Sequence, residues 1–255
     1  AQLVMTATLA VQQIERGIPG DFIEAGVWRG GNTVLLSGVL ASRSDDSRVV
    51  YAADSFKGIP EDYELEGDIN NFDSKNPNVK VKWSNRYVAG EGELKKNLRR
   101  VGLYDMDLTR IVKGFFNESF APGGELDRVA KERPVVLSLV RLDSDAFQSI
   151  KDSLDLLWDR ISVGGVVIVD DFHIPAVRRA VKEFRSRVGK EAAGPVLPIG
   201  SDYRIVCNAR GRSSVWARKG LINGKLVCDP SMNGPIELMA FLEVYPTSAF
   251  FYKLT

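Results

Sequence analysis

Short apolar segments alternate with longer amphipathic ones along this chain of 255 residues, and no other feature limits the fold as strongly. The apolar segments read DFIEAG, RVVYAADS, LTRIVKG, PVVLSLVRLD and GGVVIVDD, and Gly, Pro or acidic residues bound them. Such runs are typical of strands in a parallel sheet that is buried on both faces. Apolar residues recur at helical spacing over 150–161 and again over 177–188, just after Pro175. The repeated order of strand, helix and strand predicts an α/β fold with a doubly wound, mostly parallel sheet.

Other stretches add to this organisation. YRIVCNA and SSVWARK flank the polar turn RGR and predict a hairpin, with an antiparallel strand at one edge of the sheet. Residues 57–90 are polar, rich in Asn and Asp, and interrupted by Pro. A segment of this length between a strand and a helix is typical of an active-site lid, and a disordered spacer is the alternative. We expect one domain over residues 1–255. Its C-terminal extension at 220–255 should pack on the domain or on another subunit of a homo-oligomer.

The charge balance argues against some classes of partner. The chain has 34 basic and 33 acidic residues, and this formal net charge of +1 gives no reason to expect nucleic acid or an anionic membrane. No apolar run approaches the roughly 20 residues of a membrane span, and the opening AQLVMTATLA lacks the basic segment of a signal peptide. Cys207 and Cys228 form no CxxC pattern, so we expect a reduced, cytoplasmic setting and a small-molecule ligand. Because the first residue is not Met, we also expect further sequence before it, and export stays open.

The stretch FIEAGVWRGGNTVLL places a strand, a glycine-containing turn and a helix in succession. Gly26, Gly30 and Gly31 lie where the backbone must turn tightly and let a ligand approach. The spacing is neither GxGxxG nor that of a P-loop. Glu24 precedes the turn, and its carboxylate is unfavourable beside a pyrophosphate but suits a ligand that carries an ammonium and a sulfonium. This charge pattern predicts S-adenosylmethionine as the cofactor, and a helix cap or an ion pair is the alternative role for the acid.

The ends of the next two strands provide further candidate cofactor contacts. Asp54, followed by Ser55, ends the second strand, where an acid can accept both hydroxyls of an adenosine ribose. Gly114 and Phe115 end the third strand and suit contact with an adenine ring. Trp28 in the glycine turn is a further candidate. The alternatives are a turn-forming role for the acid and core packing for the two aromatic residues.

Two pairs of acids follow the fourth and fifth strands. Asp143 and Asp145 end RLDSD, and Asp170 and Asp171 end VIVDD. If the two strands are neighbours, four carboxylates converge, which is unfavourable unless protons or a cation neutralise them. Oxygen donors alone indicate a hard ion, with Mg²⁺ first and Mn²⁺ or Ca²⁺ as substitutes. The alternative is that these acids cap the helices that follow. His173 is a candidate general base or a simple loop residue.

The motifs IEAGVWRGG, ADSFKGIP, RLDSD and GGVVIVDDFHIPAVRRAV occur in this order and resemble the macrocin-type O-methyltransferases over about Gly17 to Arg218. That family methylates deoxysugars and related groups on antibiotics. The resemblance implies a class I methyltransferase fold with a seven-stranded sheet, and S-adenosylmethionine on the glycine-loop side. It also implies Mg²⁺ at the acids that match Asp143, Asp170 and Asp171, and a general base at Asp145.

A mechanism follows from these assignments. The metal binds an acceptor hydroxyl together with its neighbour and lowers its pKa, a base takes the proton, and the alkoxide attacks the sulfonium methyl. We expect the acceptor to be a vicinal diol on a small or sugar-bearing natural product. The alternatives are a phenolic or catechol acceptor, a dinucleotide-dependent oxidoreductase on the same fold, and a catalytically silent binding subunit.

Overall fold

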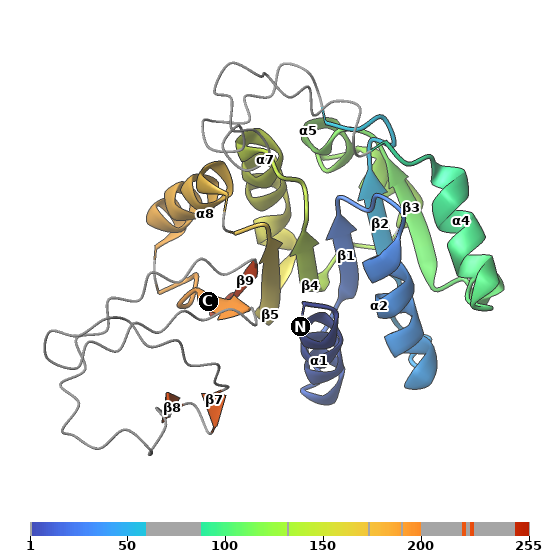
Figure 1. Cartoon of the computed structure of the whole chain (residues 1–255), viewed down its shortest axis with the longest axis horizontal. Helices are drawn as coiled ribbons and strands as arrows, with labels where there is room; N and C mark the ends of the chain where they lie inside the picture. The colour runs from blue at the N-terminus through green and yellow to red at the C-terminus, as the bar shows by residue number, and fades with distance from the viewer. Residues whose placement is uncertain are drawn as a thin grey trace, which may run out of the picture.

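A seven-stranded sheet forms the centre of the molecule (Figure 1). The computed structural model describes residues 2–59, 88–131, 133–172, 174–189, 191–199, 221–222, 225–226 and 248–254. The strand order is β3-β2-β1-β4-β5-β9-β6. The strands are β1 (Asp21–Ala25), β2 (Val50–Asp54), β3 (Thr109–Lys113), β4 (Leu137–Leu142), β5 (Ile161–Asp170), β6 (Leu197–Ile199) and β9 (Ser248–Tyr252). β7 (Leu221–Ile222) and β8 (Lys225–Leu226) form a separate pair.

The first five strands confirm the sequence prediction, and they pair in parallel. Every residue of β1 and β4 is buried, as expected of strands that helices cover on both faces. The carboxyl ends of β1, β2, β4 and β5 therefore lie at one edge of the sheet, which Figure 1 shows as arrowheads pointing the same way. In open α/β sheets this edge binds ligands.

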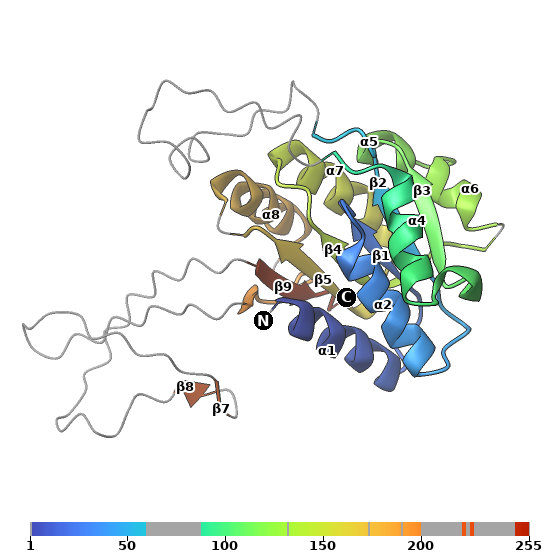
Figure 2. The same cartoon turned by 45° about the vertical axis from the view of Figure 1, so that its right-hand side comes forward.

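Helices cover both faces of the sheet because side chains alternate between the faces along each strand. Phe22 and Val50 pack with α1 (Gln2–Glu15) and α2 (Gly31–Ser42), and α4 (Glu91–Arg100) lies on the same side. Ile23 and Tyr51 point to the other face. That face holds α5 (Phe116–Ser119), α6 (Glu125–Val129), α7 (Phe147–Leu157) and α8 (Pro175–Val188), and Figure 2 shows the two layers from the side. The short 3-10 helices are η2 (Tyr104–Met106) and η3 (Trp158–Arg160).

The described sheet contains one antiparallel strand, as the sequence predicted, and this strand is β9 near the C-terminal end of the chain. β9 runs antiparallel to both β5 and β6 and lies between them. Its residues come from 248–252, within the predicted C-terminal extension, so the end of that extension belongs to the sheet. Phe251 is fully buried and its ring lies 6.4 Å from that of Trp158, because an interior strand must present apolar side chains to the covering helices.

Several sequence predictions lie outside the described residues. They include the hairpin at 203–219, Cys207 and Cys228, and residues 60–87 of the predicted lid. In the part of the chain that the structure describes, every helix is too short or too polar to cross a bilayer.

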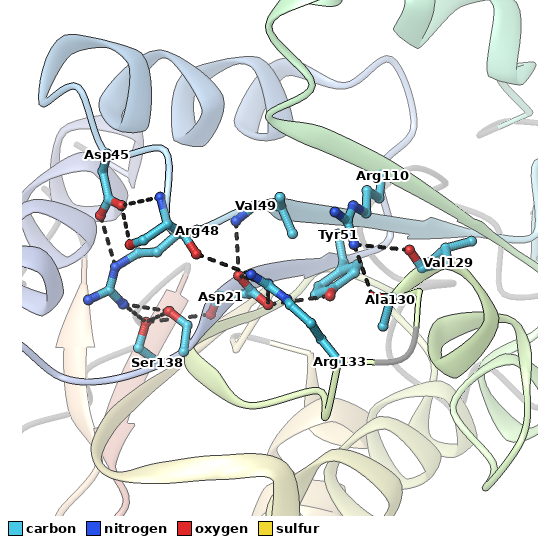
Figure 3. Close-up of polar contacts among 12 residues, drawn as sticks. Asp21, Asp45, Arg48, Val49, Tyr51, Arg110, Val129, Ala130, Arg133 and Ser138 are labelled. Atoms are coloured by element: carbon cyan, nitrogen blue, oxygen red, sulfur yellow. Dashed lines mark hydrogen bonds and ion pairs between the residues drawn. The ribbon is translucent and has the colours of Figure 1, made fainter.

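A polar network ties the strands together at the amino edge of the sheet (Figure 3). The buried carboxylate of Asp21 accepts hydrogen bonds from the Val49 N–H at 2.9 Å and from the Tyr51 hydroxyl at 3.3 Å. One terminal nitrogen of Arg133 lies 3.0 and 2.8 Å from its two oxygens. Arg48 bonds to Asp45 and to the carbonyl of Ile18 beside this network. The donors around Asp21 therefore match its charge.

We expect Asp21→Ala to lower the free energy of unfolding by about 2–3 kcal/mol, because it leaves the Val49 N–H and the buried Tyr51 hydroxyl without their acceptor. The matched control is Asp155→Ala, which also removes a carboxylate with two basic partners, Lys151 and Arg187. The side chains of Asp155, Lys151 and Arg187 are more exposed, so this substitution should lower the free energy of unfolding by less than about 1 kcal/mol. Urea unfolding of both variants measures the difference, and equal losses would contradict the role given to Asp21.

Candidate active site

A pocket lies at the carboxyl edge of the sheet. Eight residues predicted for cofactor, metal or catalysis line it: Gly26, Trp28, Asp54, Ser55, Phe115, Asp143, Asp145 and Asp171. Four others, Glu24, Gly30, Gly114 and Asp170, are not part of its lining. His173 lies outside the described residues. The sequence reading missed Phe116, Ser144 and Ser149, which also line the pocket. Phe116 directly follows a predicted site residue, Ser144 separates two of them, and Ser149 lies in the first turn of α7.

The glycine turn passes very close to the end of β4. Gly26 has φ +93°, and a Cβ there would lie 1.8 Å from the carbonyl oxygen of Asp143. Trp28 has φ +47°, so the turn continues in a conformation that few side chains adopt. The side chain of Trp28 is 44% exposed, which makes the core-packing alternative wrong for this residue. The turn therefore brings backbone and an aromatic ring to the edge of the pocket.

Asp54 holds this turn in place. Its Oδ2 accepts hydrogen bonds from the N–H groups of Val27 at 2.8 Å and Trp28 at 3.1 Å. Its Oδ1 accepts one from the N–H of Phe56 at 2.7 Å, which forms a turn of its own. The turn-forming role is therefore present, and contact with a ribose stays a prediction. An ionised carboxylate has about four acceptor positions, so these three bonds leave capacity for a ligand.

Glu24 lies behind the pocket and not in its wall. Its carboxylate is buried and accepts hydrogen bonds from Thr33 Oγ1 at 2.5 Å and from Arg141 at 3.0 Å. Burial raises the pKa of Glu24 to about 7, although Arg141 and Thr33 oppose the shift. The ion-pair role that the sequence left as an alternative is the one that the structure shows, and contact with a cofactor stays a prediction.

The two acidic pairs meet because β4 and β5 are parallel neighbours, with Leu142 opposite Val169. Asp143, Asp145 and Asp171 each offer a carboxylate oxygen within 4.8 Å of the others. Asp170 is directed to different partners: its Oδ2 accepts from Arg141, and its Oδ1 accepts from Gln2 at 2.9 Å and Ser248 at 2.5 Å. The predicted ligand set and the cluster in the structure therefore share Asp143 and Asp171 and differ in one member.

Burial raises the pKa values of two members of the cluster of Asp143, Asp145 and Asp171. Burial raises the pKa of Asp143 to about 6, with Arg141 opposing the shift. Burial also raises the pKa of Asp145 well above its usual range, and a hydrogen bond to the side chain of Asp171 adds to this. Two carboxylates can share a hydrogen bond only when one holds a proton. Asp145 and Asp171 also have φ of +56° and +48°, a conformation that costs energy and often occurs at functional sites.

Arg141 is the main site residue that sequence reasoning missed. It lies in β4 with its side chain 4% exposed and donates hydrogen bonds to Glu24, Asp143 and Asp170. A basic residue inside the apolar run LSLVRLD was the available signal, because a buried arginine needs acidic partners.

We expect Gly26→Ala to lower stability by more than about 1 kcal/mol and to weaken cofactor binding, because φ is positive and the methyl group meets backbone. The control is Gly31→Ala in the same motif, where a Cβ meets no atom within 4 Å. Thermal unfolding and calorimetric titration with S-adenosylmethionine measure both effects. The close approach would be unimportant if the two alanine variants behaved alike.

Comparison with known proteins assigns the family. The family model described as Macrocin-O-methyltransferase (TylF) matches residues 4–199. The chain is 37% identical over 68% of its length to a tetracenomycin 4'-O-methyltransferase of Streptomyces olivaceus, and 34% identical over 68% to mycinamicin III 3''-O-methyltransferase of Micromonospora griseorubida. These matches span 60% and 63% of the relatives' own lengths.

Solved structures agree. The O-methyltransferase NovP superposes with a TM-score of 0.61 at 30% identity, over 73% of this chain and 72% of that one. A calicheamicin methyltransferase superposes with a TM-score of 0.58 at 19% identity, over 76% and 73% of the two chains, which supports the fold alone. The fold is that of class I methyltransferases, and the chain belongs to the macrocin-O-methyltransferase family.

Proposed function

We propose that this chain is an S-adenosylmethionine-dependent O-methyltransferase that acts on a hydroxyl of a sugar carried by a natural product. One observation carries the proposal: the glycine turn and the acidic cluster of Asp143, Asp145 and Asp171 line a single pocket. Membership of the macrocin-O-methyltransferase family supports it, and the named relatives are O-methyltransferases of tetracenomycin and mycinamicin compounds.

The pocket suits S-adenosylmethionine, which when bound supplies a methyl group on a positively charged sulfur. Gly26 lets the glycine turn pass beside the end of β4, because a Cβ there would collide with the backbone of Asp143. Asp54 lines the pocket with acceptor capacity for ribose hydroxyls, and Ser55 lies beside it. Trp28 and Phe115 offer aromatic surface for the adenine. Glu24 lies behind the pocket lining, where it accepts hydrogen bonds from Thr33 and Arg141.

The acidic cluster suits a hard divalent cation, for which we propose Mg²⁺ with Asp143 and Asp171 as ligands. The fit rests on the donors themselves, because oxygen atoms from the carboxylates of Asp143, Asp145 and Asp171 lie within 4.8 Å of one another. When bound, such a cation lowers the pKa of a hydroxyl that contacts it. Asp170 supports the cluster at its edge, where Arg141, Ser248 and Gln2 hold it.

We assign the general base to Asp145. Its carboxylate lies in the pocket beside Asp143 and Asp171, and burial gives it a raised pKa. A carboxylate with a raised pKa accepts a proton more readily, which suits an alcohol that ionises with difficulty. A pair of adjacent hydroxyls is the acceptor that we propose, since its two oxygens can share one cation.

We expect methyl transfer from S-adenosylmethionine to sugars with vicinal hydroxyls, and much slower transfer to sugars with one isolated hydroxyl. EDTA should abolish turnover and added Mg²⁺ should restore it. Mass spectrometry of a panel of glycosides and catechols with matched ring substituents measures this. Equal rates on isolated hydroxyls would reject the diol, faster reaction of catechols would favour a phenolic acceptor, and full activity in EDTA would reject the metal.

We expect Asp145→Asn to lower kcat by about 10²–10⁴-fold while binding of Mg²⁺ and S-adenosylmethionine is retained, because the amide cannot take a proton. His173→Gln should cost much less. Asp46→Asn, an equal change at an exposed position, serves as the control. Steady-state kinetics with calorimetry test the assignment, and a severe loss in the histidine variant with a mild one in Asp145→Asn would reverse it.

A further inference from the structure

The guanidinium of Arg141 lies where three neighbouring strands end. One terminal nitrogen donates to Glu24 Oε1 at 3.0 Å and to Asp143 Oδ2 at 2.7 Å. The other terminal nitrogen donates to Asp170 Oδ2. Glu24 belongs to β1, Asp170 to β5, and Asp143 directly follows β4. One side chain therefore connects an acid behind the glycine turn to acids of two further strand ends.

The sheet register explains this position. Arg141 lies opposite Glu24 in β1 and opposite Ile168 in β5. Residues two apart on a strand point to the same face, so Asp143 and Asp170 follow Arg141 and Ile168 on the same side. A guanidinium has five donors in a rigid plane, so it can fix several carboxylates relative to one another, which a lysine cannot do.

Asp170 is also held from its opposite side. Its Oδ1 accepts from Ser248 of β9 at 2.5 Å and from Gln2 of α1 at 2.9 Å, and Gln2 also bonds to Ser248 at 2.8 Å. The backbone N–H of Asp171 donates to the same oxygen at 3.0 Å. The hydrogen bonds thus continue from β1 through Arg141 and Asp170 to the backbone of Asp171, a member of the acidic cluster.

We propose that Arg141 is a positioning residue for the cation site, which fixes Asp143 directly and Asp171 through Asp170. This inference rests on the proposed Mg²⁺ site. A basic residue can support a cation site in this way, because correct placement of the acidic ligands favours cation binding more than additional negative charge does.

Arg141 could instead only neutralise the charge of buried acids. The two roles predict opposite changes in cation affinity when Arg141 is replaced. If Arg141 only neutralises buried acids, its positive charge repels a cation bound nearby, and its removal should strengthen cation binding. If Arg141 positions the acids, its removal should weaken binding although the site becomes more negative. Cation affinity therefore distinguishes the two roles without any measurement of activity.

The experiment is a titration of the full chain with Mn²⁺, monitored by electron paramagnetic resonance. No S-adenosylmethionine or acceptor is present. We expect Arg141→Met to weaken Mn²⁺ binding by about 10–100-fold and to change the spectrum of the bound ion. Arg141→Lys keeps the charge but loses the planar fork, so it should restore only part of the affinity. The matched control is Arg133→Met, which breaks an ion pair with the buried Asp21 at the opposite edge of the sheet (Figure 3) and should leave Mn²⁺ binding unchanged.

The outcomes are distinguishable. If wild type binds Mn²⁺ and Arg141→Met binds it equally or more tightly, the positioning role is overturned and the proposed function stands. If wild type itself binds no Mn²⁺, the proposed metal site and this role both fail. Circular dichroism establishes which variants are folded. If Arg141→Met is not, Arg141→Lys decides, because wild-type affinity in that variant would overturn the role.

Discussion

The pairing of one buried arginine with acids from three strands supports the whole carboxyl edge of the sheet. Arg141 and Glu24 are both buried, and neither could stay charged there alone, because a charge away from water is unfavourable without a partner. The Asp143, Glu24 and Asp170 carboxylates raise the pKa of Arg141, although burial acts against its charged form. Their hydrogen bonds let the ends of β1, β4 and β5 carry charged side chains beside a pocket and still pack as core.

The buried acids at the two edges of the sheet differ in how their charges are matched. This difference indicates that the carboxyl edge is the functional edge. At the amino edge, Asp21 has an arginine, a tyrosine hydroxyl and a backbone N–H, so its charge is matched (Figure 3). At the carboxyl edge, Arg141 forms ion pairs with Glu24, Asp143 and Asp170. Asp145 and Asp171 lie beside Asp143. Burial raises the pKa of Glu24 to about 7 and that of Asp143 to about 6, so these acids take up protons more readily than exposed carboxylates do. A stable core does not need so many neighbouring acids, whereas a site for a cation does.

The backbone of the site is also under constraint. Gly26 passes so close to Asp143 that no side chain fits, which joins the glycine turn to the acidic cluster. Asp145 and Asp171 adopt left-handed φ values, which turn their carboxylates as the chain leaves β4 and β5. The glycine turn and the acidic cluster are therefore one structural unit, and a change in either should affect the other.

The sequence by itself determined the five parallel strands, the helices between them, and the concentration of acids at strand ends. These features depend on local periodicity and on the rule that parallel strands end at the same edge, so they need no knowledge of long-range contacts. The family resemblance also came from local motifs.

Only the tertiary structure decided which acids face the pocket. Asp170 and Asp171 are adjacent in sequence, yet Asp171 lines the pocket while Asp170 turns to Arg141, because neighbouring residues at a strand end point in different directions. The place of β9 between β5 and β6 likewise depends on pairing across some 80 residues, such as Asp170 with Ser248. The central role of Arg141 depends on register, which sets Glu24 beside it. Side-chain direction and strand register arise from contacts between distant segments, and no local pattern encodes them.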